Sequence, residues 1–238
     1  AVRGWRSLTP YMFEKNISPS WTLGKNGWYY TSKPNLQHLS KIVRMSSLRG
    51  LDGERIVELD LSGCQMNIAR AMSGRGVLRD PYEEMLAALA GKNLKLDRKT
   101  VKHHALSAFC GRSVANYDYY VRQGKETDPR ECFIAVRDTV VELGYLVNDV
   151  RHRRAQGRIM LEAMRYMVKH TGYTGLTVFD SLIAPEPTVE IAEEALKESC
   201  YRELGVLLPF TKNSIHDSSP VSGFKKNSSF GAPMLLQA

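Results

Sequence analysis

The stretches Ile56-Val57-Glu58-Leu59-Asp60 and Leu176-Thr177-Val178-Phe179-Asp180 decide the fold of this chain. Each is a short run of mainly apolar and β-branched residues, a composition typical of a strand, and each ends on an aspartate. Ser181-Leu182-Ile183-Ala184 follows the second run directly. Residues 174–185 are therefore predicted to form a hairpin whose tight turn holds Asp180. This hairpin would place Asp180 beside the end of the strand that carries Asp60.

A basic segment, Arg98-Lys99-Thr100-Val101-Lys102, lies between the two aspartates. In a helix, Arg98 and Lys102 stand one turn apart and face the same way. Two carboxylates that can share divalent metals, and a cationic helix that can hold a triphosphate, are the minimum parts of a nucleotidyl transferase. Each part alone has a plainer interpretation, because aspartates are common in turns and helical cations are often only solvated. The combination favours a catalytic site.

Length and composition exclude several classes of protein. The chain has 238 residues, 43% of them hydrophobic and 24% charged, which is typical of a soluble globular protein with a full core. No uninterrupted apolar run of about 18 residues indicates a membrane span, and no secretory segment is seen. The net charge of +8 favours a polyanionic partner, although many basic proteins bind no nucleic acid. Isolated cysteines favour reduced thiols in a cytoplasmic protein over a zinc site; they are Cys64, Cys110, Cys132 and Cys200.

The other elements follow from apolar periodicity and capping residues. Strands are expected at 55–60 and, as an edge strand, at Val206–Phe210, while residues 27–50 read as loop with a little strand. Helices are expected at 63–72, from Asp80-Pro81 to Gly91, at 98–110 behind Asp97, from Asp128-Pro129 to Gly144, at roughly 151–171 and at 189–204 behind Thr188. The helix 151–171 is expected to bury Ile159, Met160, Ala163, Met164 and Met167, whereas His103 and His104 are expected on a helix surface. The tail from His216 is predicted to be disordered. This order predicts an α+β fold, an antiparallel sheet backed by helices with a small helical subdomain.

The sequence resembles family A DNA polymerases of the bacterial repair-polymerase type at five places in the same order. The segment Thr31-Ser32-Lys33-Pro34-Asn35-Leu36-Gln37 is similar to their template–primer-binding segment, and Asp60-Leu61-Ser62-Gly63-Cys64-Gln65 is similar to motif A. Arg98, Lys102, Cys110 and Gly111 resemble motif B, the nucleotide-binding helix. Gln156-Gly157 matches a pair that precedes motif C, and Phe179-Asp180-Ser181 matches motif C itself. The resemblance covers about residues 26–210.

This resemblance implies a polymerase palm with reduced fingers. The expected division is a leading segment at 1–26, palm at 27–97, reduced helical fingers at 98–155, palm again at 156–215 and a flexible tail at 216–238. No exonuclease domain or full thumb fits in what remains. The chain would thus be either a minimal polymerase or a fragment of a larger one.

Several residues depart from the pattern of the resembled family. Ser181 stands where that family has a second acidic residue, and an Asp-Ser pair is more similar to single-subunit phage and mitochondrial RNA polymerases. Gln65 replaces the glutamate that excludes ribose, and Cys110 replaces an aromatic residue. Phe179 replaces a histidine, and Trp28 replaces an arginine. A minimal DNA-directed DNA polymerase is the main hypothesis; a primase-like or ribonucleotide-using polymerase and a catalytically inactive nucleic-acid-binding replication protein remain as alternatives.

The resemblance also implies roles for individual residues. Asp60 and Asp180 would bind two Mg²⁺ ions, or Mn²⁺, with the carbonyl of Leu61 as a further ligand. The expected nucleotide-binding residues are Arg98 and Lys102 at the triphosphate, Leu106 under the base or sugar, and Gln65 and Cys110 beside the sugar. Lys33, Asn35, Gln37 and Gln156 would contact nucleic acid, the last three in the minor groove. The expected partners are a DNA primer–template and nucleoside triphosphates, with further replication domains or proteins but no membrane.

Overall fold

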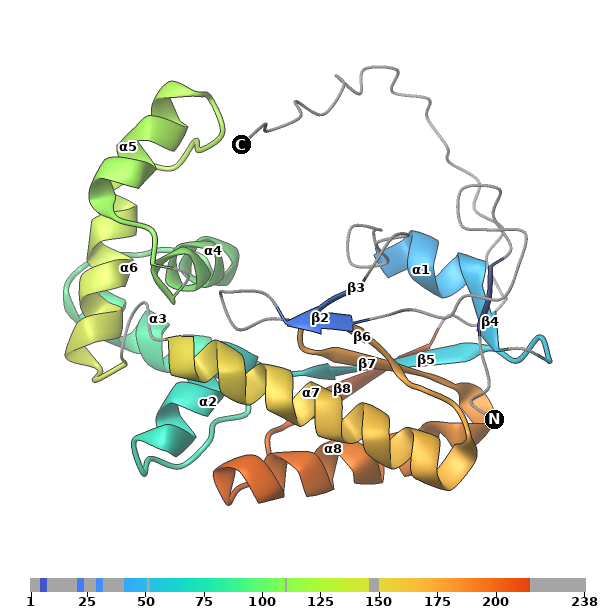
Figure 1. The fold of residues 1–238 in the computed structure, drawn as a ribbon. Helices are drawn as coiled ribbons and strands as arrows, with labels where there is room; N and C mark the ends of the chain where they lie inside the picture. The colour runs from blue at the N-terminus through green and yellow to red at the C-terminus, as the bar shows by residue number, and fades with distance from the viewer. Residues whose placement is uncertain are drawn as a thin grey trace.

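The computed structural model describes residues 5–7, 21–23, 29–31, 41–50, 52–109, 111–145 and 150–214. Its centre is a four-stranded antiparallel sheet in the order β6-β7-β5-β8 (Figure 1). The strands are β5 (Ile56–Leu61), β6 (Leu176–Val178), β7 (Ser181–Pro185) and β8 (Phe210–Ser214). Asp60 on β5 lies opposite Ser181 on β7. The end of β5 therefore lies beside the β6–β7 turn, which confirms the predicted hairpin and its placement.

Two helices cover one face of this sheet (Figure 1). They are α7 (Val150–Thr171) and α8 (Val189–Leu204), the latter preceded by a short 3₁₀ turn at Glu186–Thr188. Every second residue of β5 faces them, because side chains alternate along a strand. The inner face predicted for α7 is confirmed: Ile159, Met160, Ala163, Met164 and Met167 are all buried.

The opposite face of the sheet carries a smaller apolar cluster. Ile56, Leu176, Val178 and Ile183 meet Met45 and Leu48, which belong to α1 (Lys41–Ser47) and β4 (Leu48–Gly50). Strand β4 pairs with β1 (Trp5–Ser7), and β2 (Trp21–Leu23) pairs with β3 (Tyr29–Thr31).

The expectation of loop with a little strand for residues 27–50 is wrong for helix α1. The helix has no acidic residue in its first turn, so local sequence signals are weak there. Its stabilising contacts are tertiary, since Met45 is buried and the Arg44 guanidinium donates to the buried Glu58 carboxylate at 3.3 Å.

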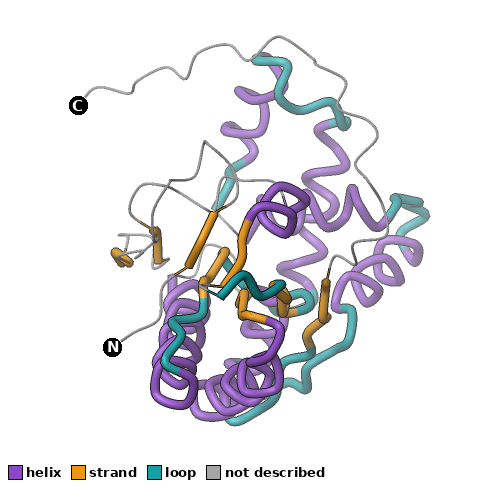
Figure 2. Tube along the Cα trace, turned by 90° about the vertical axis from the view of Figure 1, so that its right-hand side faces the viewer, coloured by secondary structure: helices purple, strands orange, loops and turns teal. Residues whose placement is uncertain are grey.

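Five helices form a second layer beside the sheet. They are α2 (Cys64–Met72), α3 (Pro81–Gly91), α4 (Arg98–Phe109), α5 (Val114–Arg122) and α6 (Arg130–Glu142). Helices α4, α5 and α6 stand to one side of the sheet (Figure 1). Figure 2, turned by 90°, shows helices on more than one side of the strands. Helices α4 and α6 share an apolar cluster with α2 and α3 that is separate from the cluster under the sheet. Helix α5 packs on α6, where the ring of Tyr117 stacks on that of Phe133. The predicted α+β class is confirmed, and the proposed domain boundaries stay a prediction.

Capping side chains set the starts of two helices that the sequence predicted, α3 and α4. The Asp80 carboxylate accepts a hydrogen bond from the Tyr82 amide at 3.0 Å, and Asp97 accepts one from Thr100 at 2.9 Å. Helix α8 does follow Thr188, but the Thr188 hydroxyl donates to the Pro185 carbonyl and caps no helical amide. Helix α5, which the sequence reasoning did not foresee, begins behind Ser113, whose side chain accepts from the Asn116 amide.

The prediction of a last strand at Val206–Phe210 is wrong in its position. Strand β8 begins at Phe210 and continues through polar residues to Ser214. The apolar character of 206–209 has another cause, because Leu208 is buried in the core under the sheet. Strand β8 is an edge strand with a largely exposed face, so it carries no apolar alternation.

His104 is another correction, because it is fully buried and not on a helix surface. It packs edge-on against the rings of Tyr117 and Phe133, which come from α5 and α6. Burial lowers the pKa of its imidazole, and its Nε2 lies 3.1 Å from the Asp128 carboxylate without the alignment of a hydrogen bond. His103 is on the surface as expected and contacts Glu126.

Two sequence-level exclusions can be compared with the structure. None of the helices that the structure describes is both long and apolar enough to cross a membrane. Cys64, Cys132 and Cys200 are free thiols, and Cys110 lies outside the described residues, as does the tail from His216.

The β6–β7 turn holds a strained residue, Phe179, whose φ of 56° is unusual for a bulky side chain. Its side chain is 41% exposed, so its removal uncovers little core. We expect Phe179→Gly to raise the free energy of unfolding by about 1 kcal/mol, because glycine adopts this backbone conformation without a Cβ clash. Thermal unfolding would show this as a melting temperature higher by about 2–4 °C. Leu207→Gly, at a similarly exposed position that lacks the positive φ, should instead lower the melting temperature. An equal fall in both variants would rule out strain at Phe179.

Candidate functional site

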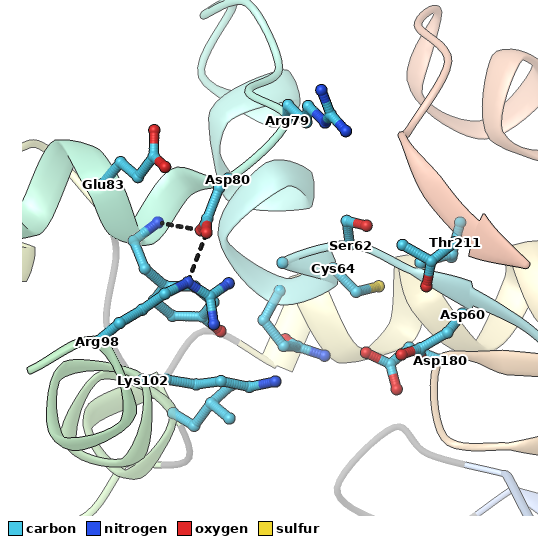
Figure 3. A pocket seen from close by; sticks show the side chains of 15 residues that line it. Asp60, Ser62, Cys64, Arg79, Asp80, Glu83, Arg98, Lys102, Asp180 and Thr211 are labelled. Carbon is cyan, nitrogen blue, oxygen red and sulfur yellow. Dashed lines mark hydrogen bonds and ion pairs between the residues drawn. The ribbon is translucent and has the colours of Figure 1, made fainter. Parts of the chain in front are cut away.

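Asp60 and Asp180 form the floor of the candidate site. Asp60 is the fifth residue of β5, and Asp180 is the second residue of the β6–β7 turn. The Leu61 amide donates to the Asp180 carbonyl at 3.1 Å, which ties the turn to the strand. The Ser181 hydroxyl donates to one oxygen of the Asp60 carboxylate at 2.8 Å. The two carboxylates lie side by side in Figure 3.

The proximity of the two carboxylates changes the acidity of one of them. Burial raises the pKa of Asp180 to about 7, and the negative charge of Asp60 adds to the rise. Lys102 opposes it, so its ammonium group lies close enough to act on this carboxyl. A cation between the aspartates would relieve both the desolvation and the repulsion.

A cavity of about 720 Å³ opens over this pair. Its lining brings together residues that the sequence analysis selected from widely separated segments. They are Asp60, Leu61, Gln65, Arg98, Lys102, Leu106 and Asp180.

Helix α4 forms the wall of the cavity opposite the carboxylates (Figure 3). Arg98, Lys102 and Leu106 recur every fourth residue, so one face of α4 supplies all three. Arg98 and Lys102 both lie over the ring of Tyr82, at 5.3 and 6.0 Å from its centroid. The wall therefore has two cations at one end and an apolar residue one turn further on, and it can hold a phosphate chain and a flat organic group respectively.

Gly63 sets how the floor meets the helices. Its φ of 54° turns the chain from β5 into α2, and a side chain there would collide with the ring of Pro81 at the start of α3. The close approach brings the N-terminus of α3 to the rim of the cavity.

Gln65, at the surface of the cavity, contacts the buried Gln156. The Gln65 amide nitrogen donates a hydrogen bond to the Gln156 side-chain oxygen. Gln65 lines the cavity, whereas Gln156 is only 3% exposed and does not. The predicted contact of Gln156 with nucleic acid stays a prediction.

Other cavity residues were not foreseen as functional. Tyr82 and Glu83 come from the first turn of α3, and Arg79 and Asp80 directly precede that helix. Thr211 comes from β8, a strand expected earlier in the sequence. The sequence predicts Asp80 only as the start of a helix. No sequence pattern distinguishes a capping aspartate that also binds a distant arginine from one that only caps. The remaining predicted site residues, Lys33, Asn35, Gln37 and Cys110, lie outside the described residues.

Side chains that could bind a metal ion at this site are few among the described residues. Across the part of the chain that the structure describes, no group of three or more His, Cys, Asp or Glu side chains is placed to hold a metal ion. The donors at the floor are the two aspartates, together with the backbone of Leu61, which lines the same cavity. Such an all-oxygen set suits a hard cation that keeps several water ligands, such as Mg²⁺.

Comparisons with known proteins add little beyond this geometry. No family model matches the chain, and no curated protein matches it. Among solved structures the chain is similar to the POL domain of Pol1 from M. smegmatis in complex with DNA primer-template and dNTP, with 16% identity and a TM-score of 0.49. The match covers 83% of this chain and 47% of that one, so this chain spans less than half of that protein. A likeness of this size bears on neither the family nor the activity of this chain.

Proposed function

We propose that the chain is a template-directed nucleotidyl transferase, and specifically a DNA-directed DNA polymerase that extends a primer. The main support for this proposal is one cavity that has two adjacent carboxylates on its floor and two cations on the facing helix. This arrangement suits a ligand that is anionic along its phosphates and needs divalent metal at the reacting phosphorus. The resemblance of the motifs around Asp60, Arg98 and Asp180 to family A polymerases supports the same assignment.

The proposed metal site consists of Asp60, Asp180 and the Leu61 carbonyl. The raised pKa of Asp180 supports this choice, because two carboxylates that repel each other gain most from a shared cation. When bound, Mg²⁺ would supply charge neutralisation at the phosphates and a lowered pKa for the attacking hydroxyl. Ser181 holds one oxygen of Asp60, which fixes the carboxylate and leaves its other oxygen for a ligand.

The nucleotide is proposed to lie along α4. Lys102 and Arg98 would bind the phosphates, and Leu106 would pack under the base one helical turn beyond Lys102. Gln65, which lines the same cavity, would then face the sugar. The primer would end at the carboxylates, where its 3′-hydroxyl displaces pyrophosphate from the nucleotide. Lys33, Asn35, Gln37 and Gln156 remain the proposed contacts to primer–template.

A primer-extension assay tests the proposal directly. A labelled primer–template is incubated with either deoxynucleotides or ribonucleotides, in Mg²⁺ or Mn²⁺. Template-directed extension is expected, with deoxynucleotides preferred. If the protein binds the duplex but extends it with neither nucleotide set in either metal, the proposal is wrong and a nucleic-acid-binding role is left.

The amide of Gln65 favours one variation of this function, the use of ribonucleotides. It can donate or accept a hydrogen bond at a 2′-oxygen, whereas a carboxylate there can only accept. We expect the wild type to discriminate weakly against ribonucleotides, since one such bond shifts selectivity by roughly 1 kcal/mol, about fivefold. Gln65→Ala should admit ribonucleotides further. Competition between the two sugars at one templated position measures this; complete exclusion by both proteins would mean that residue 65 does not face the sugar.

Duplex binding separates a polymerase from a replication initiator. The formal charge of +8 and the degenerate minor-groove acceptors favour sequence-independent affinity that falls steeply with salt. Titration of unrelated duplexes at two salt concentrations measures both properties. A strong preference for one sequence would favour the initiator.

A further inference from the structure

One carboxylate at the rim of the cavity, that of Asp80, makes two different hydrogen bonds. Its Oδ1 accepts from the Tyr82 amide at 3.0 Å and caps helix α3. Its Oδ2 accepts from Nε of Arg98 at 2.5 Å. Figure 3 shows both bonds. Asp80 thus links the N-terminus of α3 to the first residue of α4.

The backbone that carries Asp80 is itself fixed. Two residues earlier, the Leu78 amide donates to the side-chain oxygen of Asn67, and the Leu78 carbonyl accepts from its side-chain nitrogen, both at 2.9 Å. Asn67 is fully buried in α2. The segment that carries Asp80 is therefore anchored to helix α2 as well as to α3.

The Arg98 guanidinium is held on two sides. Asp80 takes the Nε–H, and the ring of Tyr82 lies under the guanidinium at 5.3 Å. The two terminal nitrogens are left for other partners, and in Figure 3 they lie on the side of the cavity towards Lys102 and Asp180. This arrangement presents a fixed pair of donors, which is the geometry that suits a phosphate group.

Asp80 has two opposing effects on an anion in the cavity. Its negative charge repels the anion, while its bond to Arg98 orients the donors. The Arg98 side chain is 52% exposed, so without a partner it would sample many rotamers and lose entropy on binding. Solvent screens part of the repulsion, because the Arg98 side chain that an anion would meet is half exposed, although the Asp80 side chain is only 21% exposed. We expect the orienting effect to exceed the screened repulsion.

We propose that Asp80 is a positioning residue that fixes Arg98 for a phosphate group of a pyrophosphate-containing ligand. Only the identity of this ligand as a nucleoside triphosphate rests on the proposed function. The positioning itself concerns anion binding and can be measured without nucleic acid or turnover.

Asp80→Asn is the informative variant, because asparagine caps a helix as well as aspartate does but has no charge to hold Arg98. Calorimetric titration with inorganic pyrophosphate and with a deoxynucleotide, each in Mg²⁺, should show affinity weaker by about three- to tenfold, the loss of one oriented contact. The melting temperature should stay unchanged. Asp97→Asn is the matched control: Asp97 caps α4 in the same way, but it is exposed and does not line the cavity. It should bind both ligands as the wild type does.

A double-mutant cycle with Arg98→Ala decides between the two effects of Asp80. If Asp80 acts through Arg98, adding Asp80→Asn to the Arg98→Ala protein should not weaken its affinity for pyrophosphate. Removal of the negative charge should instead raise that affinity slightly. Tighter pyrophosphate binding by Asp80→Asn alone would overturn the proposal, since Asp80 would then only neutralise Arg98. An equal loss in both backgrounds, or no pyrophosphate binding by the wild type, would overturn it too. Arg98-dependent pyrophosphate binding without primer extension would refute the polymerase proposal and leave the positioning role intact.

Discussion

Asp180→Asn should abolish primer extension, with a loss of at least about a thousandfold, because a neutral amide is a poor ligand for Mg²⁺ and the metal contributes several kcal/mol. Asp60→Asn should have the same effect, since the two carboxylates form one site. Duplex affinity should stay close to that of the wild type in both variants. Single-turnover extension and duplex titration of the same preparations measure the two properties.

The Asp180→Asn variant should also be more stable than the wild type when metal is absent. The pKa of Asp180 is raised from 3.8 to about 7 in the folded protein, so the folded state keeps a proton that the unfolded state has released between these values. Wild-type stability therefore falls as pH rises from about 4 to about 7, and the penalty persists above that range. Asp180→Asn removes this penalty and should melt several degrees higher at pH 8 in a chelator.

A matched substitution separates these effects from a general response to Asp→Asn. Asp138 is an exposed residue of α6 that does not line the cavity. Asp138→Asn should leave two properties unchanged, the rate of primer extension and the pH dependence of the protein's stability. More than a few per cent of extension activity in either Asp60→Asn or Asp180→Asn would contradict the proposed two-carboxylate metal site.

Lys102→Ala should reduce kcat/KM for nucleotide by about 10- to 100-fold, the value of a charge-assisted contact to a phosphate. Its ammonium group faces the cavity between the carboxylates and Arg98, and no other part of the proposed site replaces it (Figure 3). Duplex affinity should change by no more than about two- to threefold, the effect of one peripheral phosphate contact. Steady-state kinetics with varied nucleotide measures the first quantity.

Lys99→Ala is the control for Lys102. Lys99 lies on the same helix and is exposed, but it does not line the cavity. It should leave nucleotide kinetics unchanged. Lost duplex binding with normal nucleotide KM in Lys102→Ala would place Lys102 on the nucleic-acid path and not at the triphosphate.

Features with local causes could be predicted from this sequence. The strand that carries Asp60 and the strand that leads into the turn with Asp180 follow from short apolar runs. Asp80 and Asp97 mark helix starts because their side chains bond to amides only two or three residues away. The grouping of Arg98, Lys102 and Leu106 on one wall of the cavity follows from helical periodicity alone.

Features with tertiary causes could not. Helix α1 is stabilised by the distant Glu58, and His104 is buried by helices α5 and α6. Leu208 belongs to an apolar segment that resembles a strand, but it lies outside β8 and is buried in the core under the sheet. In the site, the second role of Asp80 depends on Arg98, which lies 18 residues away. Patterns in sequence indicate which face a residue occupies, but not which distant partner it meets there.

Helix α2 belongs to both apolar clusters, and this has a consequence for how the protein opens. Ile68 packs in the cluster under the sheet, whereas Met66 and Ala69 pack in the cluster of the helical layer. Neither cluster can come apart without exposing one side of this helix. The two layers should therefore unfold as one cooperative unit. In native-state hydrogen exchange, the amides of α2 should exchange only through global unfolding, while those of the outlying helix α5 should exchange earlier through local opening.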